Sequence, residues 1–239
     1  MFVDWARHTL LVLALHPDDE AIGCGGLISR VLGAGGRVFV LWVTIADIAD
    51  FSEAGGSSAA QRREEMRRAH AFWPLTGSHL ALPGQDYNLR LDTVPRAELI
   101  GLIERGEHPL SLAALAPTVV AIPDPSSYNQ DHAALGTAAI TALRPGPDTY
   151  RHQPSLVPGY EEVGDCWNGG RPGPAPQMFV ELSEHDLDRK IGGLAAHASQ
   201  CRPHPHTRSE HALRALAAVR GAQSGYAFAE AFHCLRVRA

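Results

Sequence analysis

Short apolar runs alternate with helix-like segments along most of this chain, and this alternation constrains the fold more than any other feature. The runs Leu10–Leu15 and Arg37–Thr44 are almost free of charged residues, as expected for strands that are buried on both faces of a sheet. Strands that alternate with helices predict an α/β fold, with a mostly parallel sheet and helices on both faces. The other expected strands are His79–Leu82, Val119–Ile122 and Gln177–Leu182, and the expected helices are Ala21–Gly33, Ala60–Phe72, Ala97–Glu104, Asp131–Leu143 and Leu187–Ala198.

Length and composition indicate one domain. A chain of 239 residues, of which 45% are hydrophobic, can bury one sizeable core, so we expect a single domain over residues 1–239. Between residues 144 and 176 proline and glycine recur, which predicts an irregular insertion. This insertion holds Tyr160, Glu161, Glu162 and Trp167, whose aromatic and polar groups suit either a sugar-binding wall or a surface connection.

Charge, hydropathy and cysteine content exclude several classes of protein. The formal net charge of -5 gives no general attraction to nucleic acid or to an anionic membrane. No apolar run approaches the ~20 residues that cross a bilayer, so we expect no membrane span. The four cysteines form no Cys-x-x-Cys pair, which favours a reduced, cytoplasmic protein.

The first apolar run ends in an imidazole and three carboxylates, His16, Asp18, Asp19 and Glu20. Strands of an α/β sheet deliver functional groups at their carboxyl ends, so these side chains should lie at the mouth of a cleft. One imidazole and one carboxylate can bind a divalent metal ion, and a second carboxylate can then move protons. The alternative is a polar turn in which Asp18 or Asp19 caps the next helix.

A third candidate ligand follows the strand Val119–Ile122. His132 stands at the start of the next helix, the same kind of place as His16. Two histidines and one aspartate make a three-ligand site with an open position, which is typical of catalytic zinc. The alternative for His132 is a residue of the first helical turn, with Asp131 as the cap.

Together these motifs resemble the LmbE-like (PIG-L) family of zinc-dependent N-deacetylases, which remove acetyl groups from small molecules that contain N-acetylglucosamine. The resemblance implies a Rossmann-like α/β fold, an N-acetylated amino sugar as substrate and a homo-oligomer as one option. It covers nearly the whole chain in the family's order, at residues 16–26, 62–69, 129–132, 190–200 and 225–232.

Carried over residue by residue, the resemblance assigns His16, Asp19 and His132 to one zinc ion and Asp18 to the general base. Asn129 stands where many members carry a histidine that stabilises the oxyanion. The Asn129 amide can still donate a hydrogen bond to an oxyanion, but it cannot act as a general acid.

The resemblance also implies that Arg62 and Asp86 contact the substrate. The alternative for Arg62 is an ion pair with Glu65 on the helix surface. We expect His197 to pack in the core or to lie behind the site. The histidines of Cys201–His206 alternate with prolines that hold them apart, so this segment predicts a solvated loop rather than a second metal site.

Two non-catalytic alternatives remain, a nucleotide-binding module and a sugar-binding protein that has lost its activity. Gly23 and Gly25 begin a Gly-x-Gly-x-x-Gly pattern, but Ile28 stands where the third glycine would be. The preceding carboxylates would also repel a phosphate. The favoured prediction is therefore a zinc-dependent deacetylase.

Overall fold

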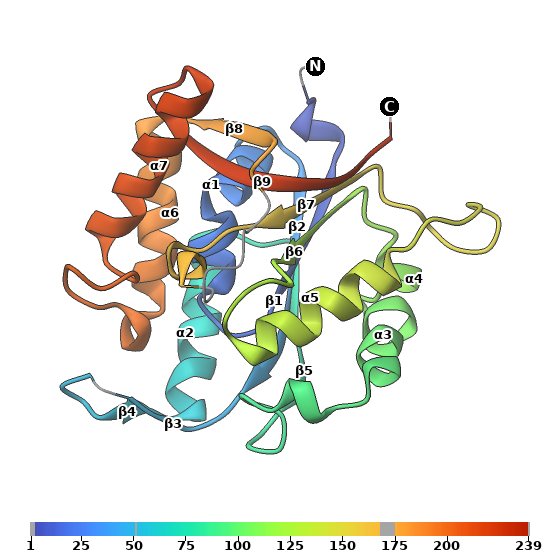
Figure 1. Cartoon of the computed structure of the whole chain (residues 1–239), viewed down its shortest axis with the longest axis horizontal. Coiled ribbons are helices and arrows are strands. Elements are labelled where there is room, and N and C mark those ends of the chain that lie inside the picture. The colour runs from blue at the N-terminus through green and yellow to red at the C-terminus, as the bar shows by residue number, and fades with distance from the viewer. Residues whose placement is uncertain (1–2, 51, 168–174, 239) are drawn as a thin grey trace.

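The computed structural model describes residues 3–50, 52–167 and 175–238, and a sheet of seven strands forms the centre of this part of the chain (Figure 1). The strand order is β5-β2-β1-β6-β7-β9-β8. The first five strands of this order, from β5 to β7, are parallel to one another, whereas β9 is antiparallel to both β7 and β8. The expected mostly parallel sheet is confirmed. Its strands are β1 (Thr9–Ala14), β2 (Arg37–Ile45), β5 (Gly77–Pro83), β6 (Val119–Pro123), β7 (Leu156–Tyr160), β8 (Met178–Leu182) and β9 (Phe228–Val237).

Helices cover both faces of the sheet, as Figure 1 shows. One face carries α1 (Asp19–Gly33), α2 (Ala59–Phe72), α6 (Glu184–Ala196) and α7 (Glu210–Ser224). The other carries α3 (Arg96–Arg105), α4 (Leu112–Leu115) and α5 (Gln130–Ala142). No helix within the described ranges is both long and apolar enough to span a membrane. The short elements are β3 (Ile48–Ala49), β4 (Gly56–Ser57) and the 3-10 helices η1 (Trp5–Arg7), η2 (Leu91–Thr93), η3 (Val163–Cys166) and η4 (Ala198–Gln200).

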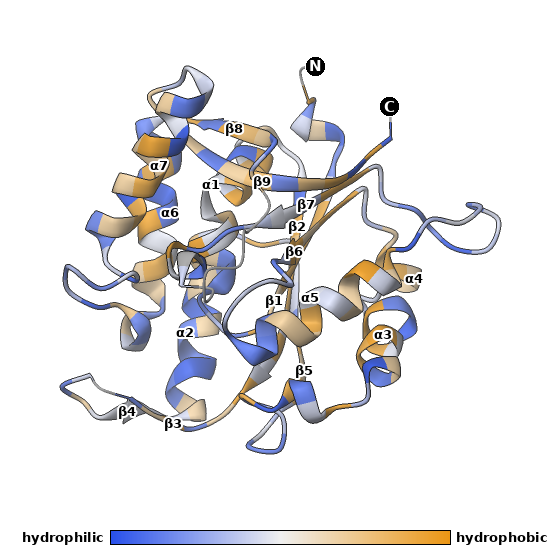
Figure 2. Ribbon diagram, in the orientation of Figure 1, coloured by the Kyte–Doolittle hydropathy of each residue, from blue (hydrophilic) through white to orange (hydrophobic). Residues whose placement is uncertain are grey.

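The sheet separates two hydrophobic cores, and the central strand supplies both. In β1, Leu10 and Val12 pack into the core beneath α1, whereas Leu11 and Leu13 pack into the core beneath α5. This alternation follows from the two-residue period of a strand. Figure 2 shows the result as hydrophobic central strands, with the polar residues gathered on the outer helices and loops.

Strand β7 corrects the prediction of an irregular insertion between residues 144 and 176. All five residues of β7 are buried, and the strand pairs in parallel with β6. Pro158 is tolerated because the register with β9 shifts between Val157 and Pro158. Because of its prolines, this core strand was not predicted from the sequence. The elements α7 and β9 were not predicted either. Residues 168–174 of the predicted insertion lie outside the described ranges.

Helix α1 lies very close to its neighbours because glycines form its contact face. A Cβ atom on Gly23 would overlap the ring of Tyr160, and one on Gly25 would lie 2.9 Å from the side chain of Lys190. The glycine-rich stretch that follows the first motif therefore allows close helix packing, and it does not form a phosphate-binding turn.

This close approach lets a buried ion pair reach the backbone of α1. Lys190 Nζ lies 2.5 Å from Glu230 Oε1 and donates to the carbonyl of Ile22 at 2.6 Å. The Glu230 carboxylate accepts hydrogen bonds from the backbone N–H groups of Gly26 and Leu27, at 2.7 and 2.6 Å. The pair thus connects α6 and β9 to the middle of α1.

We predict that Lys190→Met destabilises the fold by roughly 3–5 kcal/mol, because it leaves the Glu230 carboxylate buried without a counter-charge. Glu210→Gln is the control, since it breaks an exposed pair with Arg214 and should cost about 0–1 kcal/mol. Urea-induced unfolding measures both values. Equal losses in the two variants would contradict a structural role for the buried pair.

Candidate metal centre and substrate cavity

The site lies where the direction of the sheet connections reverses. Strand β1 connects through α1 to β2 on one side, and its other neighbour is β6, from later in the chain. At such a switch point the carboxyl ends of the two strands border an open crevice. His16 follows β1, and His132 lies in the first turn of α5, after β6. Their ring centroids are 5.7 Å apart.

The structure brings the three predicted ligands together. His16, Asp19 and His132 are buried, and each offers one ligand atom within 4.8 Å of the other two. Asp19 Oδ2 lies 3.8 Å from His16 Nδ1 and 3.5 Å from His132 Nε2. Two imidazole nitrogens and one carboxylate oxygen around a common point fit a divalent metal ion with an open coordination position.

Asp131 orients the ring of His16 from behind. Its Oδ2 lies 3.1 Å from His16 Nε2, which leaves Nδ1 of the same ring facing Asp19. The two Asp131 oxygens also accept hydrogen bonds from the backbone N–H groups of Leu89 and Leu91, at 2.7 and 2.9 Å. A carboxylate behind a ligand histidine fixes the tautomer and orientation of the ring.

A second carboxylate lies behind His132. Glu162 Oε1, just after β7, is 3.9 Å from His132 Nδ1 and has no hydrogen-bond partner in the described part of the chain. Burial and the neighbouring carboxylates of Asp19 and Asp165 raise the pKa of Glu162 well above its usual range. Burial also lowers the pKa of His132, which favours the neutral ring that binds metals.

Asp18 provides a buried carboxylate next to the candidate metal ligand Asp19. It is 1% exposed, and neither oxygen has a hydrogen-bond partner among the described residues. Arg62 Nη2 lies 3.5 Å from Oδ1, and Arg208 Nε lies 3.5 Å from Oδ2. Burial raises the pKa of Asp18, but the positive charges of Arg208 and Arg62 outweigh it and hold this pKa below its ordinary value. The Asp18 backbone adopts a strained φ of 135°.

The spacing of Arg62 and Glu65 on α2 places both side chains on one helix face. Arg62 donates to the carbonyl of Pro17 at 2.7 Å, and Glu65 accepts from the backbone N–H and the hydroxyl of Ser199, both at 2.7 Å. Arg62 therefore supports Asp18 and its loop, and it is buried, in contrast to the surface ion pair that was the alternative.

Glu20 and His197 form a further buried pair behind the first motif. His197 Nε2 lies 2.6 Å from Glu20 Oε1, and Glu20 Oε2 accepts from Trp42 Nε1 at 2.8 Å and from the backbone N–H of Asp18 at 3.2 Å. His197 is thus connected to the Asp18 loop through hydrogen bonds of Glu20.

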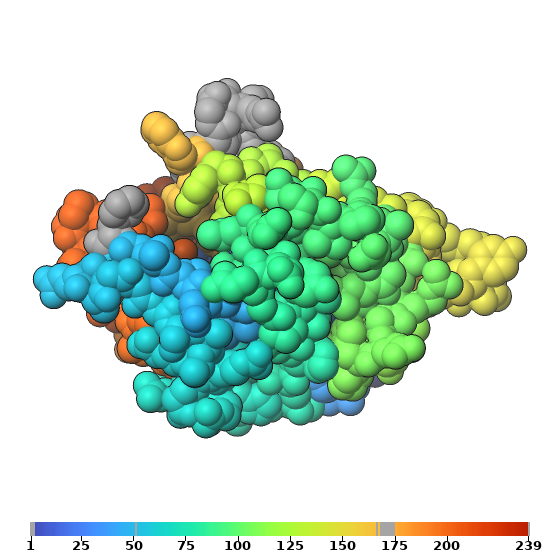
Figure 3. All heavy atoms as spheres, turned by 90° about the horizontal axis from the view of Figure 1, so that it is seen from below, coloured from blue at the N-terminus to red at the C-terminus, as the bar shows by residue number. Residues whose placement is uncertain are grey.

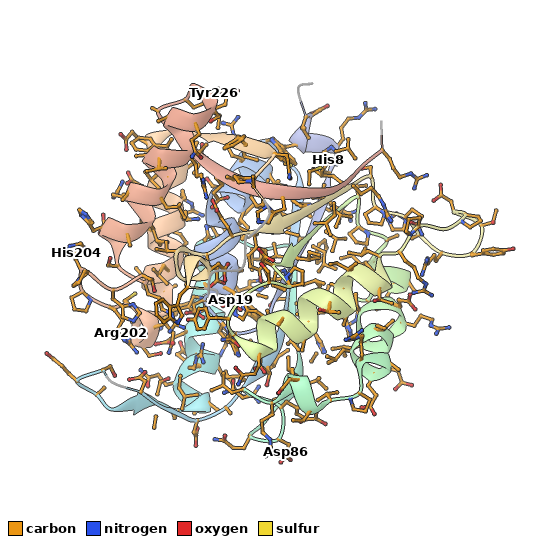
Figure 4. The ribbon with its side chains drawn as sticks, in the orientation of Figure 1. His8, Asp19, Asp86, Arg202, His204 and Tyr226 are labelled. Atoms are coloured by element: carbon orange, nitrogen blue, oxygen red, sulfur yellow. The ribbon has the colours of Figure 1, made fainter. Side chains whose placement is uncertain are left out.

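A cavity of about 400 Å³ opens beside His16. Of the predicted substrate-contacting residues, Arg62 lines this cavity but Asp86 does not. Asp86 is exposed, and Figure 4 places it at the lower edge of the molecule, well apart from Asp19. Asn88, two residues later, lines the cavity instead, with a buried Oδ1 that lacks a partner in the described ranges.

Other lining residues were also not predicted. The segment after β5 lies beside the β3–β4 segment on the surface seen from below (green and blue-cyan, Figure 3). No sequence signal placed Gln200 or the residues after it at the site. The whole lining is formed by His16, Ile48, Ala49, Asp50, Ser52, Arg62, Asn88, Leu89, Tyr128, Asn129, Gln200, Arg202, His206, Thr207 and Arg208.

Asn129 combines two tasks at the cavity. Its Oδ1 accepts a hydrogen bond from the backbone N–H of Asp131 at 2.9 Å and so caps α5. Because the oxygen is used in this way, the amide N–H₂ group is left to donate to a ligand in the cavity that Asn129 lines.

Comparison with known proteins identifies the family. Residues 10–143, more than half of the chain, match the GlcNAc-PI de-N-acetylase (PIG-L) family. The chain belongs to this family. A curated relative, diacetylchitobiose deacetylase of Thermococcus kodakarensis, is 26% identical over 226 residues, which cover 92% of this chain and 80% of the relative.

Solved structures share the fold. An N,N'-diacetylchitobiose deacetylase from Pyrococcus horikoshii superposes with a TM-score of 0.71 at 19% identity, over 97% of this chain and 85% of that one. GalB, a 4-carboxy-2-hydroxymuconate hydratase from Pseudomonas putida, gives a TM-score of 0.63 at 19% identity over 98% of both chains. Because the second protein is a hydratase, the reaction must be argued from the site.

We predict that Asp131→Asn weakens zinc binding about 10–100-fold, because the neutral amide no longer fixes the tautomer and basicity of the His16 ring. Asp186→Asn is a matched control, since Asp186 is also buried but bonds to Ser29 and Ser183, away from the cavity. Calorimetric titration with zinc measures both affinities. An unchanged affinity in Asp131→Asn would contradict the orienting role.

Proposed function

We propose that this protein is a zinc-dependent hydrolase that removes an N-acetyl group from a small molecule containing an amino sugar. The observation that carries the proposal is the carboxylate of Asp18, which is buried beside the His16–Asp19–His132 group and accepts no hydrogen bond from any residue that the structure describes. A structural metal site needs no such group, whereas hydrolysis of an amide needs a base next to the metal. The family and the deacetylase relative support the same reaction.

Each side chain has a role in this proposal. His16, Asp19 and His132 would hold the zinc ion, which supplies Lewis acidity that activates water and polarises the acetyl carbonyl. Asp18 accepts the proton of the attacking water on a carboxylate oxygen. Asn129 donates its amide N–H to the oxygen of the former carbonyl.

Proton delivery to the leaving amine also falls to Asp18. Asn129 has no acidic proton, and His197 is fully buried behind Glu20. A carboxyl group that has taken up a proton from water can return it to the amine as the C–N bond breaks.

The free thiols of Cys24, Cys201 and Cys234 support a reducing compartment, and we propose that the enzyme acts in the cytoplasm.

We expect the zinc-loaded protein to release acetate from N-acetylglucosamine glycosides, and Asp18→Asn to lower turnover by about 10²–10⁴-fold. The substitution preserves the size of the side chain but removes its basicity, so zinc content should stay the same. Acetate release and metal content are measured together, before and after chelation and re-addition of zinc.

Asp19→Ala is the contrasting variant, and it should lose both metal and activity. If Asp18→Asn lost zinc while Asp19→Ala kept it, the two roles would have to be exchanged. If no glycoside released acetate, a hydratase or a non-catalytic sugar- or nucleotide-binding protein would replace the proposal.

Asn129→Ser tests the oxyanion role without loss of the helix cap, because serine is also a good N-cap residue. Turnover should fall by about 10²–10³-fold, with little change in the free energy of unfolding. Steady-state kinetics and urea unfolding of the same sample separate the two effects. Unchanged turnover would remove Asn129 from the reaction.

A further inference from the structure

Residues 201–209, between η4 and α7, form one wall of the cavity. This segment contributes Arg202, His206, Thr207 and Arg208 to the lining. Its histidines do lie at the surface, as the sequence predicted, but its arginines turn toward the cavity. Figure 4 shows Arg202 on the same side of Asp19 as His204, at the edge formed by this segment.

The cavity wall is basic, although the chain carries a net charge of -5. Three arginines line the cavity, Arg62, Arg202 and Arg208, and Asp50 is the lining carboxylate. The carboxylates of Asp18 and Asp19 are 1% and 3% exposed, so they contribute little to the cavity surface. Asp18 faces Arg62, and Asp19 faces His132.

Two of the three arginines are already engaged. Arg202 donates to the carbonyls of Ser199 and Cys201, at 2.7 and 2.8 Å, and to the carboxylate of Asp50 at 2.6 Å. Arg62 is 3% exposed and is held by a backbone carbonyl and by Asp18. Both guanidinium groups are therefore held in place by protein partners.

Arg208 differs from them. Its side chain is 38% exposed, its Nη1 donates to Gln200 at 2.8 Å and its Nε faces Asp18. The remaining nitrogen, Nη2, has no partner in the described part of the chain. This leaves two N–H donors for a ligand in the cavity.

His206 adds a second donor from the same segment. Its Nδ1 accepts a hydrogen bond from the backbone N–H of Arg208 at 3.0 Å. The neutral ring therefore carries its proton on Nε2, which is free to donate. His206 is exposed and lines the cavity together with Arg208.

We propose that Arg208 and His206 bind an anionic group, a carboxylate or a phosphate, that the substrate carries beside its N-acetylated sugar. This inference rests on the proposed function, because it names the substrate class for the same cavity. A guanidinium group matches the geometry of both anions, and a basic wall around a cavity raises the local concentration of an anionic substrate. The same lining includes Ile48, Leu89 and Tyr128, whose apolar and aromatic side chains suit the apolar face of a sugar ring.

The test compares acetate release from the methyl glycoside of N-acetylglucosamine with release from three anionic forms, which carry a phosphate on C1, a phosphate on C6 or a carboxyl-bearing ether on C3. We expect kcat/KM for at least one anionic form to exceed that of the neutral glycoside about 10-fold or more, as for hydrogen bonds to charged groups. Arg208→Gln should abolish this preference through KM.

The preference is the ratio of kcat/KM for the anionic form to kcat/KM for the neutral glycoside. It remains measurable even if Arg208→Gln lowers both values because Asp18 has lost a neighbouring positive charge. His206→Ala, which has no contact with Asp18, should reduce the preference by a smaller factor. Arg214→Gln is the control, since it removes the same charge from the exposed face of α7 and should leave the ratio unchanged.

Calorimetry on the metal-free protein adds a measurement that needs no turnover. The preferred anionic form should bind more tightly than the neutral glycoside, and Arg208→Gln should remove the difference. If the wild type deacetylated neutral and anionic forms equally, or if Arg208→Gln kept the preference, the anion site would be refuted and the deacetylase would stand. If no form were deacetylated, the proposed function would fail, and calorimetry alone would decide on the anion site.

Discussion

The carboxylate of Asp131 connects the three segments on which the whole site depends. It bonds to the ring of His16 after β1, and it accepts the backbone N–H groups of Leu89 and Leu91 after β5. Asp131 also directly precedes His132 in α5. A buried carboxylate that lost these partners would cost several kcal/mol, roughly 1–3 for each unsatisfied bond. The two candidate ligand histidines and the loop that carries Asn88 therefore take their positions together.

A second constraint is the buried charge of Asp18. Two guanidinium groups, from α2 and from the 201–209 segment, compensate this charge from 3.5 Å without a hydrogen bond. The positive charges lower the pKa of Asp18 and favour its ionised form, while its oxygens accept no hydrogen bond from the described residues. This combination suits a general base. The bond of Glu65 to Ser199 connects α2 to η4, which directly precedes the 201–209 segment, and so helps to hold the two guanidinium groups near Asp18.

The parts that could be predicted from the sequence are those set by local pattern. The strands β1 and β6, and the motifs that end them, follow from apolar runs that stop at polar residues. Strand β7 was not predicted because it contains Pro158, which is accommodated by a shift in the register between β7 and β9. Asn88 rather than Asp86 reaches the cavity because the bonds to Asp131 turn the chain there, with Leu89 at a φ of 58°. Arg208 follows a proline-rich run, and only tertiary contacts bring it to Asp18.

The reversal of connections at β1 and β6 should create one metal site. Anomalous diffraction at the zinc absorption edge, from crystals of the zinc-loaded protein, tests this directly. We expect a single strong peak per chain, at about 2.0–2.2 Å from a ring nitrogen of His16, a ring nitrogen of His132 and a carboxylate oxygen of Asp19. A main peak elsewhere, such as beside the paired rings of His204 and His211, or no peak in protein that had been given zinc, would contradict it.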